Sequence, residues 1–99
     1  MKIYRGHRSI RGAIVEVDGA PLAPANLPGH DVELAFEWGY NGSGPEHLAL
    51  AILADCLGEE SALVASREFK RKFVAGFDDV WEVSEGEIRA WFDGQKLLD

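Results

Sequence analysis

Apolar and polar residues alternate in short segments of the N-terminal third, which is the pattern of strands that bury one face. Residues 3–4 and residues 13–19 predict two strands of a hairpin. Residues 20–29 hold three prolines and predict a loop, because proline restricts φ and lacks an amide donor. Residues 32–38 place Val, Leu, Phe and Trp at every second position and predict a third strand.

The pattern then changes to that of a helix apolar on nearly every side. Ser43 and Glu46 have the spacing of a capping box, and Pro45 suits a first helical turn. Between Leu48 and Leu57, Asp55 is the only charged residue. We expect this helix to be largely buried and to end at Gly58 in a left-handed conformation.

Residues 59–75 predict a second helix, in which Ala62, Ala65, Phe69 and Phe73 form one apolar stripe. Gly76 is expected to end it.

A short strand over residues 80–83 follows. Ser84 and Glu87 repeat the capping-box spacing, ahead of Ile88, Trp91 and Phe92, and predict a third helix that frays after Gly94.

These segments predict an α+β fold in one domain over residues 1–99. We expect a small, mostly antiparallel sheet of three to four strands packed with about three helices, the first of them largely buried. A chain of 99 residues has room for one hydrophobic core. No apolar run approaches the roughly 20 residues that cross a bilayer, and no signal-type segment follows the basic N-terminus, so we expect a cytoplasmic protein.

Charge is unevenly distributed along this acidic chain, whose formal net charge is −7. Residues 1–12 carry four cations and no acid, whereas residues 13–66 carry nine acids and no lysine or arginine. A second basic block lies at residues 67–72, and the C-terminal segment is again acidic. Two short basic blocks in an acidic molecule make a poor footprint for DNA or RNA. Direct nucleic-acid binding is therefore disfavoured, and basic protein partners are favoured.

The loop from Gly39 to Pro45 is the sharpest local signal for a ligand, because backbone amides at a helix N-terminus can hold an anion. The lysine of a phosphate-binding loop is missing, and Glu37 and Glu46 flank the segment. Glycines that permit tight turns, with Ser43 as a helix cap, explain the loop without a ligand.

Side chains that carry catalysis or bind metals are scattered. Cys56 lies late in the apolar helix and is read as a buried structural thiol. His7, His30 and His47 have no metal-site spacing, so no metal, cofactor or enzymatic activity is expected. The three tryptophans lie on periodic apolar faces and are read first as core residues: Trp38, Trp81 and Trp91.

The segment Phe-Glu-Trp-Gly-Tyr-Asn-Gly-Ser-Gly-Pro at residues 36–45, with the apolar run at residues 48–53, resembles a family of small uncharacterised proteins encoded by bacteria, phages and plasmids. The resemblance extends to residues 4–6 and 69–71 and to Trp81 with Ile88. It implies a mobile-genome context, and no catalytic residue is carried over from the family to this chain.

From charge and this context, we hypothesise a non-enzymatic interaction protein of mobile-element type. Its acidic surface would occupy a basic site, such as a nucleic-acid-binding one, on a host protein or ribonucleoprotein complex, as an anti-CRISPR-like inhibitor would. The alternative is a small-ligand or anion-sensing domain that uses the loop from Gly39 to Pro45. The candidate partner-binding residues are Glu33, Glu37, Tyr40, Asn41, Glu46, Glu59 and Glu60. A candidate basic patch comprises Arg5, Arg8, Arg11, Lys70 and Arg71.

Overall fold

A computed structural model of the chain describes residues 1–25, 27 and 35–98. It contains four strands: β1 (Ile3–Ser9), β2 (Gly12–Val17), β3 (Ala20–Pro21) and β4 (Trp81–Ser84). Its helices are α1 (Ser43–Leu57), α2 (Glu59–Lys72), the short 3₁₀ helix η1 (Val74–Gly76) and α3 (Glu85–Leu98). The predicted α+β class is confirmed.

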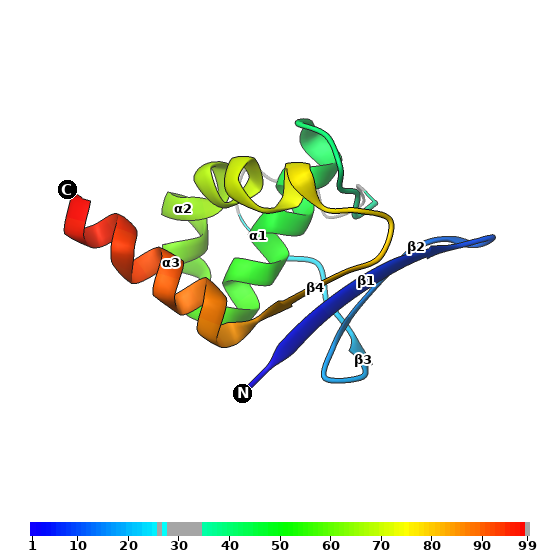
Figure 1. Cartoon of the computed structure of the whole chain (residues 1–99), viewed down its shortest axis with the longest axis horizontal. Coiled ribbons are helices and arrows are strands. Elements are labelled where there is room, and N and C mark those ends of the chain that lie inside the picture. The colour runs from blue at the N-terminus through cyan, green and yellow to red at the C-terminus, as the bar shows by residue number, and fades with distance from the viewer. Residues whose placement is uncertain (26, 28–34, 99) are drawn as a thin grey trace.

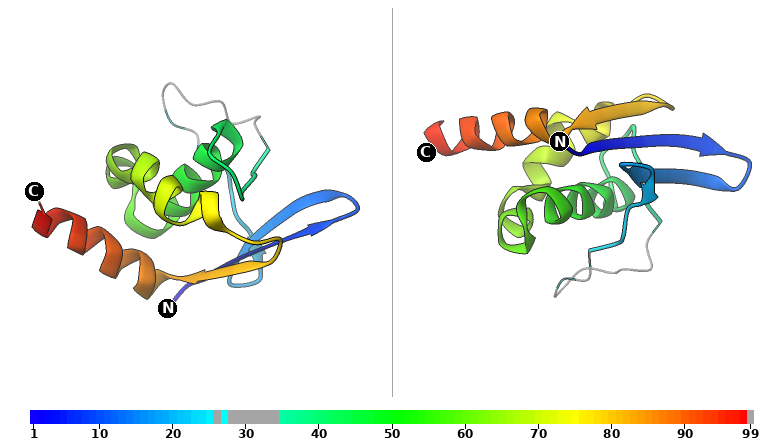
Figure 2. Two further views of the ribbon diagram at one scale, coloured as in Figure 1. Left: turned by 45° about the horizontal axis from the view of Figure 1, so that its top comes forward. Right: turned by 90° about the horizontal axis from the view of Figure 1, so that it is seen from below.

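The strands form one antiparallel sheet in the order β3-β2-β1-β4. In Figure 1 the helices lie above this sheet, and α3 and the tip of the β1–β2 hairpin point to opposite ends of the molecule. The two further views agree that β4 leads directly into α3 (Figure 2). The C-terminal strand therefore reaches the sheet by pairing with the N-terminal one, which puts residues from both ends of the chain side by side.

The sheet register separates a covered face from an open one. Tyr4 lies opposite Val17 and Val83, and Gly6 lies opposite Val15 and Trp81. Tyr4, Gly6, Val15, Trp81 and Val83 are all buried, as expected for a face packed on the helices. Arg5, between Tyr4 and Gly6, points to the open face and pairs with Glu82.

The core is built mainly from α1 and the residues it contacts. The buried residues of α1 are Pro45, His47, Leu48, Ala49, Leu50, Ala51, Ile52, Leu53 and Cys56. Asp55, the charged residue of this apolar stretch, joins the helix to β1: its Oδ2 accepts a hydrogen bond from the Tyr4 hydroxyl at 2.7 Å and one from Lys2 Nζ at 3.2 Å. Burial, with the hydrogen bond to Asp55, raises the pKa of Tyr4. This hydroxyl therefore stays protonated where an exposed tyrosine ionises.

The predicted third strand is wrong where it can be compared. Residues 32–34 lie outside the described part of the chain, and residues 35–38 have no regular secondary structure. Their alternation has another cause: Trp38 is buried in the core, while Phe36 is half-buried with its ring 5.0 Å from that of His47. The burial of alternate side chains thus produces a strand-like sequence pattern in residues 35–38, which pair with no described strand.

Two other boundaries differ at the sheet edge and the C-terminus. β3 lies inside the predicted loop, where Pro21 pairs with Glu16 at the outer edge of the sheet. An edge tolerates proline because one side needs no amide donor. The third helix continues past Gly94 to Leu98 instead of fraying.

The second helix ends earlier than expected. It ends at Lys72, and the last residues of the predicted span form η1. α1 ends at Gly58 as expected, but the expected left-handed conformation is wrong: its φ of 98° and ψ of 164° belong to an extended region that is open essentially only to glycine.

The two capping boxes have opposite outcomes. Ser84 and Glu87 bond reciprocally: Glu87 N donates to Ser84 Oγ, and Ser84 N donates to Glu87 Oε1, each at 3.1 Å. At α1 the N-cap is Gly42 and no side-chain cap bond forms, so the expected role of Ser43 is wrong. Ser43 is already the first helical residue, one position too late for its hydroxyl to cap the helix.

This contrast predicts different costs for two matched serine replacements. Ser84→Ala removes one bond of a complete capping box and should lower the free energy of unfolding by about 0.5 to 2 kcal/mol. Ser43→Ala should cost less than about 0.5 kcal/mol, because an exposed surface hydroxyl is removed. Urea unfolding of both variants measures the difference. Equal losses would contradict the assignment of the caps.

Candidate functional site

The Arg8 side chain connects β1 to the irregular segment before α1. Its Nη1 lies 2.6 Å from Glu37 Oε1, and its Nη2 donates to the Trp38 carbonyl at 3.1 Å. The guanidinium also lies over the Trp38 ring, 4.4 Å from the centroid. The hydrogen bond to Glu37 raises the pKa of Arg8. Arg8 is therefore held as a structural clamp and is not a free member of a basic patch.

A second acidic segment reaches the same clamp from the η1–β4 connection. Asp79 Oδ1 lies 3.4 Å from Arg8 Nε, and the Asp79 side chain is 89% exposed. Asp78 is also exposed, and the next apolar side chain, Val80, is 73% exposed. Such a long, exposed ion pair contributes little to stability, so these acids remain accessible to a partner.

The loop from Gly39 to Pro45 packs tightly against the same segments. Gly39 has a φ of 88°, and its N–H donates to the Val74 carbonyl at 3.0 Å, just before the acidic connection. The Tyr40 ring covers Gly42, where an added Cβ would lie 2.7 Å from the ring. At Gly44 an added Cβ would lie 2.8 Å from Glu37 Cβ and 3.2 Å from the Tyr40 hydroxyl.

These contacts bear directly on anion binding at the start of α1. The space beside Gly42 and Gly44 is taken by the Tyr40 ring and the Glu37 side chain. Glu37 also brings a carboxylate to the region where an anion would have to lie. The glycines are explained by this close packing.

The structure thus assembles one exposed surface from two distant segments. We name it the acidic–aromatic surface, and it comprises Glu37, Tyr40, Asn41, Asp78, Asp79 and Val80. Tyr40 is 51% exposed and Asn41 is exposed. Glu37 and Asp79 pair with the Arg8 guanidinium and Asp78 adds a third carboxylate, so the surface is net negative even when Arg8 is counted with it. Exposed aromatic rings are enriched in protein interfaces, and the surrounding carboxylates are complementary to a basic partner.

The other predicted partner-binding residues lie elsewhere. Glu46 lines a hollow beside α2 with Leu63 and Val64. Glu59 and Glu60 are exposed in the first turn of α2 and form no ion pair within the described ranges. Glu33 lies outside the described residues. Of the predicted set, the structure brings Glu37, Tyr40 and Asn41 together.

The predicted basic patch is divided between the sheet and α2. Arg5 lies 2.6 Å from Glu82, and Arg71 lies 3.0 Å from Glu68. Arg11 is in the exposed hairpin turn, and Lys70 is half-buried on α2. Three of the five cations, counting Arg8, already have acidic partners.

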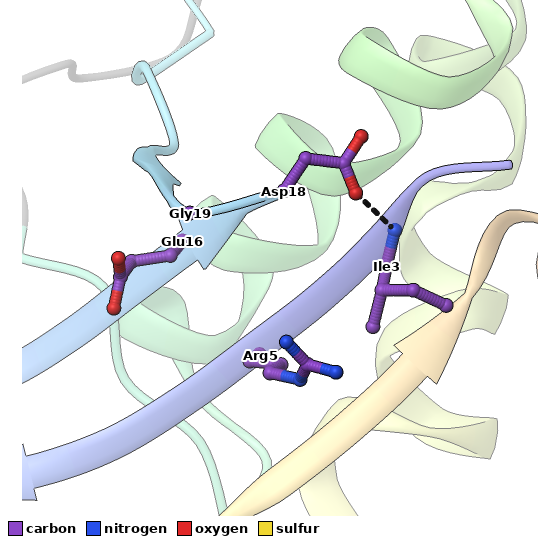
Figure 3. A pocket seen from close by; sticks show the side chains of 5 residues that line it. All are labelled: Ile3, Arg5, Glu16, Asp18 and Gly19. Carbon is purple, nitrogen blue, oxygen red and sulfur yellow. Dashed lines mark hydrogen bonds between the residues drawn. The ribbon is translucent and has the colours of Figure 1, made fainter.

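The open face of the sheet carries a small polar hollow lined by Ile3, Arg5, Glu16, Asp18 and Gly19 (Figure 3). Asp18 accepts a hydrogen bond from the Ile3 N–H at 2.9 Å, which fixes the β2–β3 turn to β1. The volume of about 60 Å³ is far below the 300 Å³ or more of ordinary ligand sites. This hollow has a structural role.

Other described side chains that could act in catalysis or bind a metal are not assembled into a site. Cys56 is buried, and burial raises the pKa of its thiol, which disfavours the reactive thiolate. Across the part of the chain that the structure describes, no three His, Cys, Asp or Glu side chains are placed to hold a metal ion. None of the described helices combines the length and hydropathy needed to cross a membrane.

Sequence reasoning missed Asp78, Asp79 and Val80 as site residues. An acidic pair followed by valine was visible, but nothing local connects it to Tyr40. The connection depends on Arg8 and on the bond between Gly39 and Val74, which only the folded chain supplies.

Fold and site define a small α+β domain with an exposed acidic and aromatic surface. Compared with known protein families, the chain matches a family of unknown function, DUF6166, over residues 4–94. The chain belongs to that family. No curated protein and no solved structure matches it.

Proposed function

We propose that this protein is a non-enzymatic interaction protein that binds a basic site on a partner through its acidic–aromatic surface. The observation that carries the proposal is that Arg8 pairs with both Glu37 and Asp79, which brings the exposed acids before β4 to the segment that holds the exposed Tyr40 ring. Aromatic side chains provide contact area at low entropic cost, and surrounding carboxylates select and attract a cationic partner. The net charge of −7 adds long-range attraction to the same class of partner.

The partner we propose is a host protein or ribonucleoprotein complex with a basic, nucleic-acid-binding groove. The protein would be carried by a phage or plasmid and would act as an anti-defence inhibitor of anti-CRISPR type. Support comes from charge, from the lack of a concentrated cationic footprint and from the resemblance at residues 36–45. This last step rests on functional analogy.

The geometry favours this proposal over an anion sensor built on the loop from Gly39 to Pro45. The Tyr40 ring and the Glu37 side chain occupy the space beside the glycines at the start of α1. A bound anion would have to displace both and would meet Glu37 and Glu46 as like charges.

Affinity capture from host lysate with three baits tests the proposed surface. The wild type should retain a basic partner, and Asp78→Lys/Asp79→Lys should lose it. Glu59→Lys/Asp93→Lys makes the same change in charge at exposed positions on α2 and α3, and this variant should retain the partner. The partner should be released as salt shortens the Debye length from about 10 Å at 0.1 M to about 3 Å at 1 M.

Two results would count against the proposal. Equal loss with both double variants would indicate a dependence on total charge and not on this surface. Retention that is indifferent to salt would remove the electrostatic basis of recognition.

A further inference from the structure

The outward face of α2 carries two exposed apolar residues between opposite charges. Leu63 is 47% exposed and Val64 is 79% exposed. Glu60 lies one turn before them and Arg67 one turn after them, and both are exposed. Because residues three and four apart share a helix face, these four form one stripe, which we name the α2 stripe.

The α2 stripe lies opposite the face that α2 buries. The buried residues of the helix are Ala62, Ala65, Ser66 and Phe69. Helical geometry places their centre about half a turn from the stripe. Val64 therefore points away from the core, and Leu63 lies at the side of the helix and is still 47% exposed.

The order of side chains makes the α2 stripe complementary to itself. In an antiparallel pair of α2 helices related by a two-fold axis between Leu63 and Val64, each leucine would face the valine of the second copy. Glu60 of one copy would then lie opposite Arg67 of the other, and the same pair would recur on the far side of the axis. A two-fold interface requires this kind of self-complementary patch.

A hollow beside the stripe adds room for side chains from a second copy. It is lined by Glu46, Leu63, Val64, Ser66, Arg67 and Glu68 and has a volume of about 370 Å³. Neither Glu60 nor Arg67 forms an ion pair with any residue in the described ranges. Both charges are thus available to an intermolecular partner.

We propose that the protein forms a homodimer through the α2 stripe, with two antiparallel α2 helices, an apolar centre of Leu63 and Val64, and two flanking Glu60–Arg67 pairs. The occupant of this face is a second copy of the chain, because the charge order matches its own reversed copy. The proposal uses no residue of the acidic–aromatic surface and does not depend on the proposed function.

Sedimentation velocity of the purified chain tests the dimer, at concentrations up to about 1 mM. The wild type should approach twice the monomer mass as concentration rises. Val64→Glu places a carboxylate at the apolar centre and should sediment as a monomer. Ile10→Glu places the same charge on an exposed apolar residue of the β1–β2 turn, outside both proposed surfaces, and should dimerise as the wild type does. A wild type that stays monomeric over the whole range would overturn the proposal, as would a Val64→Glu variant that still dimerises.

Charge reversal identifies the pairing itself, at low ionic strength where exposed pairs are least screened. Glu60→Arg alone would oppose two arginines, and Arg67→Glu alone would oppose two glutamates, so each should dimerise more weakly than the wild type. An equimolar mixture restores both pairs in a heterodimer and should associate more strongly than either variant alone. Circular dichroism confirms that each variant is folded. A mixture that associates no better than its components would overturn the assigned register.

Discussion

Phe69→Ala is expected to lower the free energy of unfolding by about 3 to 5 kcal/mol. Phe69 has no exposed surface, and its ring centroid lies 4.8 Å from that of Phe73 and 5.4 Å from that of Trp91. The side chain therefore joins α2, the residue after it and α3 in one aromatic cluster. Truncation leaves a cavity that rigid neighbours cannot fill. Because domains of this kind are stable by about 5 to 15 kcal/mol, the loss is a large share of the total.

Val64→Ala is the matched control, since it removes apolar atoms from the opposite face of the same helix. Val64 is 79% exposed, and its truncation should change stability by no more than about 0.5 kcal/mol in the monomer. Urea unfolding at low protein concentration compares the two. Similar losses would show that α2 does not pack through the Phe69 face.

Gly6→Ala is expected to lower the free energy of unfolding by about 1 to 3 kcal/mol or more. A Cβ at Gly6 would lie 2.3 Å from both Cε2 and Nε1 of Trp81. The Trp81 ring has little freedom to move, because it stacks on Phe77 at 4.3 Å and meets the Trp38 ring edge-on at 5.7 Å. The added methyl group would therefore disturb the β1–β4 pairing and the aromatic packing behind the acidic–aromatic surface.

Gly94→Ala is a control with the opposite expected sign. Gly94 lies within α3, and an added Cβ there meets nothing within 4 Å. Alanine in a helix should raise stability by up to about 1 kcal/mol. Trp81→Phe, with its smaller ring, should reduce the cost of Gly6→Ala in a double-mutant cycle. Strict additivity of the two changes would contradict a direct contact between residues 6 and 81.

Of the two positions with the largest expected effects, Gly6 is the one connected to the proposed binding surface. Gly6 packs against Trp81, whose ring meets that of Trp38, and the Arg8 guanidinium that lies over Trp38 pairs with Glu37 and Asp79. Loss of affinity after Gly6→Ala would thus follow from displaced supporting side chains. Asp78→Lys/Asp79→Lys changes only exposed groups, which makes it the cleaner test of binding.

The amino-acid sequence by itself determined the helices, the hairpin and the cap of α3. Each of these depends on residues close together in the chain: the stripe of Ala62, Ala65 and Phe69 is set by helical periodicity, and Ser84 and Glu87 meet one turn apart. Gly58 could also be identified as the residue that ends α1, because few other residues tolerate a positive φ between two helices. The excess of acids was likewise a property of composition.

Only the tertiary structure decided which of these acids form a surface. Arg8 meets Glu37 and Asp79 because β1 passes beside the segment before α1 and next to β4, and no local pattern records these meetings. Long-range packing also explains the strand-like pattern of residues 35–38: Trp38 is covered by the Arg8 guanidinium and the Trp81 ring, and these residues pair with no described strand. The periodicity of apolar residues indicates which side chains are buried. Long-range packing decides which residues cover them and which charged groups stay exposed to a partner.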